Sequence, residues 1–141
     1  MNEENGMPQL PNPNHQFDIR LSPTPRGARL ARLLAVEWLR PRRDIPYAVT
    51  EAAERIVAEL TTNAATHGRV AGRDFRLALV AHPGLLRIEV SDTRGDELPE
   101  PRAGRGLSLV EELADRWGVA PGPVPRKTVW AELDHPGGRL P

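Results

Sequence analysis

The chain has 141 residues, 39% of them hydrophobic, and its 19 basic and 19 acidic residues give a formal net charge of zero at pH 7. The neutral net charge implies no broad surface for a polyanion. The sequence also contains no nucleic-acid reader motif, so direct nucleic-acid binding is not expected. The absence of cysteine excludes disulfides, thiolate metal sites and cysteine nucleophiles. No apolar stretch resembles a signal peptide or approaches a membrane span in length, and we expect one soluble cytoplasmic domain without a membrane partner.

The ordered part of the chain is expected to begin at residue 17. Residues 1–16 are rich in asparagine and proline and offer little that could pack, which predicts a disordered lead. In residues 17–21 apolar and polar side chains alternate, as is typical of a half-buried strand at a sheet edge. Thr24 followed by Pro25 is a helix-start pattern, and the apolar spacing predicts a helix over residues 26–40.

Arginines are concentrated in and just after this first predicted helix. Two interpretations stay open for them: a solvated helix face, or a docking surface for an acidic partner protein. The sequence does not separate the two. The arginines concerned are Arg26, Arg29, Arg32, Arg40, Arg42 and Arg43.

A long amphipathic helix is predicted over residues 47–67, because its apolar residues recur at spacings of three and four. Gly68 supplies a stop for it. Glu59 and Asn63 lie one turn apart on the same edge of the apolar stripe, where a polar group is costly to bury unless it is used. His67 is interpreted as a packed or capping residue, since no second histidine or carboxylate cluster indicates a metal site.

The second half of the chain begins with two predicted antiparallel strands, residues 75–81 and 85–91, joined by a short turn. Asp92 ends the second strand. The polar segment 93–103 is long for a compact domain and is therefore expected to be a functional or mobile loop.

Two glycines, Gly104 and Gly106, precede a further amphipathic helix that is expected to continue to Trp117 and to stop at Gly118. The remaining expected elements are a strand beginning near residues 119–120, a turn over 121–126, a closing strand over 128–133 and a tail over 135–141.

Several of these polar features are consistent with one nucleotide site. A helix N-terminus that opens with glycines suits a phosphate, because its backbone amides are exposed and its dipole is positive. The carboxylate of Asp92 suits an exocyclic amine such as that of adenine. The amide oxygen of Asn63 suits Mg²⁺, and Glu59 could receive a proton from a hydroxyl that attacks a γ-phosphate.

Four motifs occurring in order resemble those of the Bergerat-fold ATPases, a superfamily that includes histidine-kinase catalytic domains and type II topoisomerase ATPase domains. The small stand-alone bacterial anti-sigma-factor serine/threonine kinases are the most similar members. The resemblance covers residues 17–134. Its motifs are residues 59–68, 88–92, 104–110 and 127–133.

The resemblance implies an α+β fold, a two-layer α/β sandwich whose mixed β-sheet is covered by helices on one face. It implies ATP and Mg²⁺ as cofactors, with Glu59 as the general base and Asn63 as the Mg²⁺ ligand. It also implies that Asp92 contacts the adenine amine and that residues 93–103 form a lid. The remaining residues that it assigns to nucleotide binding are His67, Gly104, Arg105, Gly106, Leu107 and Thr128.

Two function hypotheses follow. In the first, the chain is an anti-sigma factor that phosphorylates a STAS-type antagonist on serine or threonine. Its partners would be a sigma factor and that antagonist, and a homodimer is compatible with this picture. In the second, the chain is a non-enzymatic regulator with weak or lost ATP binding, since Arg94 and Asp96 stand where the related kinases have glycine. A histidine-kinase fragment is poorly supported, because no segment with a phospho-acceptor histidine precedes the ATPase-like region.

Overall fold

The computed structural model describes residues 15–67, 73–92, 106–121 and 127–136. Three helices and five strands lie in these ranges. In chain order they are β1 (His15–Leu21), α1 (Pro25–Leu39), α2 (Tyr47–His67), β2 (Phe75–His82), β3 (Leu85–Asp92), α3 (Gly106–Leu113), β4 (Arg116–Pro121) and β5 (Lys127–Asp134).

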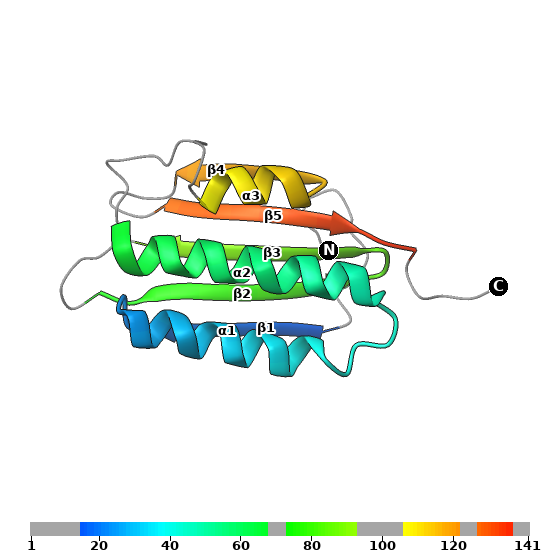
Figure 1. Ribbon diagram of the computed structural model, residues 1–141, viewed down its shortest axis with the longest axis horizontal. Helices are drawn as coiled ribbons and strands as arrows, with labels where there is room; N and C mark the ends of the chain where they lie inside the picture. Colours follow the sequence, from blue (N-terminus) through cyan, green and yellow to red (C-terminus); the bar gives the residue numbers. More distant parts are fainter. Residues whose placement is uncertain (1–14, 68–72, 93–105, 122–126, 137–141) are drawn as a thin grey trace, which may run out of the picture.

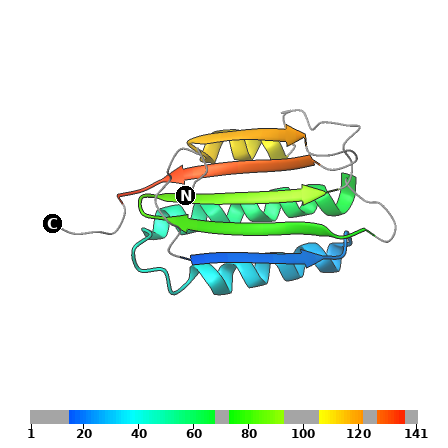
Figure 2. The ribbon, with the colours of Figure 1, turned by 180° about the vertical axis from the view of Figure 1, so that it is seen from behind.

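The helices and strands form two layers, as the family resemblance implies. The helices α1, α2 and α3 lie side by side on one face of a five-stranded sheet with the order β1-β2-β3-β5-β4 (Figure 1). Seen from behind, the other face of the sheet carries none of the described helices (Figure 2). The core fills the space between the layers, where residues such as Ile56, Leu79 and Ile88 are fully buried.

The predicted mixed sheet is wrong in one respect, since every pairing between the described strands is antiparallel. The decisive pair is β3 with β5, in which Asp92, the last residue of β3, lies opposite Lys127, the first residue of β5. A parallel neighbour would require the chain to return to the start of β3 before β5 began.

The start of α1 follows the predicted pattern. Thr24 has an extended backbone, and its hydroxyl oxygen accepts a hydrogen bond from the Gly27 amide at 3.0 Å. Pro25 is the first residue of the helix, where a missing N–H costs nothing. The predicted range 26–40 is therefore confirmed to within one residue at each end.

The first strand begins two residues earlier than predicted. His15 and Gln16, assigned to the disordered lead, pair with Ala81 and Val80 of β2. Both side chains are exposed, so the hydrophobic pattern gave no sign of them. A sheet ladder is built from backbone groups, which polar residues supply as well as apolar ones.

The long helix and the central hairpin agree closely with the prediction. The helix α2 covers the predicted 47–67, and β2 and β3 each extend one residue beyond the predicted strands. Gly84 in the hairpin turn has a φ of 80°, a conformation that favours glycine. None of the described helices is long and apolar enough to cross a membrane.

The predicted helix ending at Gly118 is wrong in its second half. The helix α3 ends at Leu113, and Trp117 and Gly118 lie in β4, opposite Ala131 and Trp130 of β5. An apolar residue four positions after Leu113 also fits a helical period, so the pattern alone is ambiguous over so few residues. Pairing with β5 decides in favour of the strand.

A network of charged side chains crosses the helix-free face of the sheet. Arg87 contacts both Glu89 and Glu132, and its guanidinium lies 4.7 Å from the centre of the Trp130 ring. Burial acts to raise the pKa of the Glu132 carboxyl, but hydrogen bonds from Arg116 and Arg87 outweigh it and hold the pKa below its ordinary value of 4.5. The charged residues of this network come from all five strands: Asp18, Arg76, Arg87, Glu89, Arg116, Glu132 and Asp134.

Candidate functional site

The four elements that carry the described residues of the predicted site meet at one end of the molecule. The C-terminal ends of α2 and β3 and the N-terminal ends of α3 and β5 all lie at the left of Figure 1. The helix α2 packs against α3, β3 and β5. The fold therefore collects motifs that are up to 70 residues apart in the sequence.

Glu59 and Asn63 lie in the C-terminal half of α2, one turn apart and half-buried. At about 100° per residue they lie on the edge of α2 away from Ala65, which faces α1. Within the described residues neither side chain forms a hydrogen bond or ion pair with the protein. A carboxylate and an amide placed in this way are available to a ligand. His67 is the last residue of α2.

Asp92 forms a contact that the sequence did not indicate. Its two carboxylate oxygens accept hydrogen bonds from the Lys127 ammonium, at 2.9 and 3.1 Å. Both side chains are almost fully buried, with exposed fractions of 10% and 8%. The sequence singles out Lys127 as the only lysine among the 19 basic residues, but it does not indicate the partner of that lysine.

Thr128 lies on the other face of the sheet. Its hydroxyl is 2.7 Å from the Ser91 hydroxyl, whereas the neighbouring residues Asp92 and Lys127 pair on the helix-covered face. Successive side chains of a strand point to opposite faces. The structure therefore does not bring the Thr128 side chain to Asp92, although the resemblance assigns both residues to nucleotide binding.

The glycine motif is described only from its second glycine. Gly106 begins α3, and the Leu107 side chain, with 1% exposed, is part of the core. Leu107 can therefore contribute to a nucleotide site only through its backbone. Gly104, Arg105 and the predicted lid, residues 93–103, lie outside the described residues.

The arrangement agrees with a comparison of the sequence with protein-family models. Residues 21–131, well over half of the chain, match the model of the histidine kinase-like ATPase domain. The chain belongs to the histidine kinase-like ATPase family.

A solved structure supports the same fold. This histidine kinase-like ATPase is similar to the crystal structure of the RsbU and RsbW domains of Rv1364c from Mycobacterium tuberculosis, with a TM-score of 0.68 and 21% sequence identity. The match covers 86% of this chain and 32% of that one, so the chain spans about a third of the length of that protein. At this identity the likeness establishes the fold. A search of curated proteins found no match.

The residues of this ATPase domain fit a magnesium ion that is shared with a nucleotide. In the described ranges no group of three or more histidine, aspartate or glutamate side chains could hold a metal. Mg²⁺ in phosphoryl-transfer sites usually takes one or two protein ligands and completes its shell with phosphate oxygens and water. The half-buried Asn63 amide, which has no hydrogen-bond partner in the described protein, can supply such a ligand.

Proposed function

We propose that the chain is an ATP-dependent protein serine/threonine kinase that also sequesters a sigma factor, with a STAS-type antagonist as its kinase substrate. The observation that carries this proposal is that Glu59 and Asn63, in the C-terminal half of α2, have no hydrogen bond or ion pair within the described residues. The helix α2 ends on the side of the domain where β3 ends and where α3 and β5 begin (Figure 1). Membership of the ATPase family supports ATP as the ligand. Similarity to a solved structure containing an RsbW domain supports the regulatory role.

Each side chain would have a distinct role. The Asn63 amide would hold Mg²⁺, which neutralises charge on the phosphates when it is bound. The Asp92 carboxylate would accept a hydrogen bond from the adenine amine. The Glu59 carboxylate would accept the proton of the substrate hydroxyl as that oxygen attacks the γ-phosphorus. Backbone amides at the start of α3, from Gly106 onward, would meet the phosphates.

The proposal is tested by measuring nucleotide binding and then phosphotransfer. Titration calorimetry of the full chain with ATP should give a binding isotherm in the presence of Mg²⁺ and a weaker one after chelation with EDTA. Incubation with Mg-ATP and a cognate antagonist should then yield phosphoserine or phosphothreonine, detected by mass spectrometry. Absence of both heat and phosphorylation at millimolar ATP would count against a kinase.

That negative result would favour the second candidate, a non-enzymatic partner-binding regulator. The observation in its favour is the sequence just after Asp92, where Arg94 and Asp96 replace the glycines of the related kinases. Bulky charged side chains at those positions would restrict how closely the backbone approaches a nucleotide.

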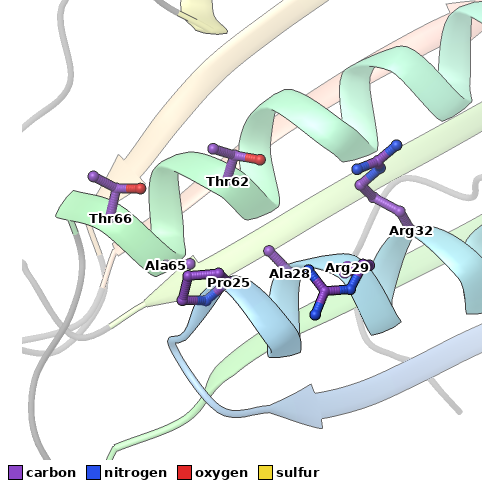
Figure 3. Close-up of a pocket in the computed structure, with 7 residues that line it drawn as sticks. All are labelled: Pro25, Ala28, Arg29, Arg32, Thr62, Ala65 and Thr66. Carbon is purple, nitrogen blue, oxygen red and sulfur yellow. The ribbon is translucent and has the colours of Figure 1, made fainter.

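A second surface is suited to an acidic partner. A groove of about 190 Å³ separates the outer surfaces of α1 and α2, and its residues include Arg29 and Arg32 on one side and Thr62 and Thr66 on the other (Figure 3). Within the described residues neither arginine forms an ion pair. Leu33, with 62% exposed, lies on the same helix. Exposed arginine and leucine side chains together suit an acidic amphipathic segment.

We therefore expect Arg29→Glu/Arg32→Glu to weaken capture of the sigma factor or the antagonist by about tenfold or more, because attraction becomes repulsion. Surface plasmon resonance against the purified partner would measure the change. Arg20→Glu is the matched control, since Arg20 is exposed on the helix-free face of the sheet. Equal affinities for the two variants would remove this groove from the docking surface.

A further inference from the structure

The buried ion pair between Asp92 and Lys127 has an unusual position. It is the last pair of the β3–β5 ladder, on the helix-covered face, on the side of the domain where α2 also ends (Figure 1). Counted over the whole residue, backbone included, Asp92 is 8% exposed and Lys127 is 6% exposed. Desolvating two charges costs about as much as their attraction returns, so stability alone gives no reason for such a pair. A role of the pair in binding a ligand would explain why two charged groups are buried there.

The pair presents an acceptor and a donor next to each other. The ammonium nitrogen lies 2.9 and 3.1 Å from the two oxygens of Asp92. A carboxylate can accept about four hydrogen bonds, and an ammonium carries three donors. Both groups have further contacts in the protein. A ligand placed against the pair would share or replace these contacts while Asp92 and Lys127 remain bonded to each other.

Adenine has the complementary pattern on one edge of its ring. The 6-amino group is a donor, and the adjacent ring nitrogen N1 is an acceptor. We propose that Lys127 reads the base, donating a hydrogen bond to N1 of adenine while Asp92 accepts one from the 6-amino group. This inference rests on the proposed function, because it concerns the same nucleotide.

The same arrangement rejects a 6-oxopurine in that orientation. Guanine and hypoxanthine carry an oxygen at position 6 and a proton on N1, so acceptor would meet acceptor at Asp92 and donor would meet donor at Lys127. A site that leaves buried polar groups mismatched discriminates strongly against the wrong ligand. Lys127 would thus contribute to selectivity for ATP over GTP and inosine triphosphate.

The test compares ATP with 1-deaza-ATP, in which a C–H group replaces N1. Calorimetry of the full-length chain with Mg²⁺ should show the analogue binding about tenfold or more weakly than ATP, since a hydrogen bond from a charged group is lost. In Lys127→Met, which keeps most of the length of the side chain and removes its charge, the two nucleotides should bind within twofold of each other.

Each outcome decides. Equal affinities of the wild-type chain for both nucleotides would overturn the role of Lys127 and leave the kinase proposal intact. If 1-deaza-ATP bound more weakly than ATP by the same factor in wild type and in Lys127→Met, the role of Lys127 would also be overturned, because another group would then contact N1. Failure of ATP itself to bind would overturn both proposals. If Lys127→Met does not fold because the charge of Asp92 is left buried without its partner, the double variant Asp92→Asn/Lys127→Met removes both charges. In that variant too, the affinities for ATP and 1-deaza-ATP should lie within twofold of each other.

Discussion

Glu59→Gln is expected to lower the rate of phosphotransfer from Mg-ATP to the antagonist by on the order of 100-fold or more, the usual contribution of a general base. Glutamine preserves the shape of the side chain but cannot accept the proton of an attacking hydroxyl. Because Glu59 is half-buried at the edge of α2, and its carboxylate has no partner within the described residues, the substitution breaks no hydrogen bond or ion pair there.

The measurement is a single-turnover phosphorylation assay, with calorimetry of Mg-ATP binding beside it. Binding should change by no more than about threefold, since the lost interaction belongs to the transition state. Glu54→Gln is the matched control, because Glu54 is another half-buried carboxylate of α2. Phosphorylation that is unchanged in Glu59→Gln would remove Glu59 from the role of base.

Gly27→Ala is expected to destabilise the folded chain by about 3 kcal/mol, at the upper end of the range for overpacking. A Cβ atom at this position would overlap the backbone carbonyl oxygen of Ser22. That oxygen is held in the turn before α1, where it accepts a hydrogen bond from the Thr24 amide at 2.9 Å. A backbone atom in a tight turn cannot move aside as the end of a flexible side chain can.

Thermal unfolding followed by circular dichroism would measure the change, which corresponds to roughly 10 °C in Tm for a chain of this size. Gly118→Ala is the informative comparison. Its Cβ would lie 2.9 Å from an atom of the Trp130 ring, on the face of the sheet that no described helix covers. The ring can shift, so this substitution should cost clearly less. A Gly27→Ala variant as stable as wild type would show that the turn before α1 is pliable.

Much of the local structure could be predicted from the sequence, because its causes act over a few residues. The cap of α1 by Thr24 and Pro25, the bounds of α2 and the hairpin turn at Gly84 all follow from hydrogen bonds and backbone preferences within about four positions. The order of the four motifs likewise carried the family membership that the family model confirms. The roles of the individual site residues remain predictions.

The tertiary structure decided what depends on strand pairing. The segment after Leu113 had an ambiguous period, and pairing with β5 made Trp117 and Gly118 part of a strand. The register of β5 against β3 placed Lys127 against Asp92 and turned Thr128 to the opposite face, beside Ser91. A shift of one residue in register would exchange these two neighbours between the faces of the sheet. Register is fixed by contacts between residues far apart in the chain, which no local pattern records.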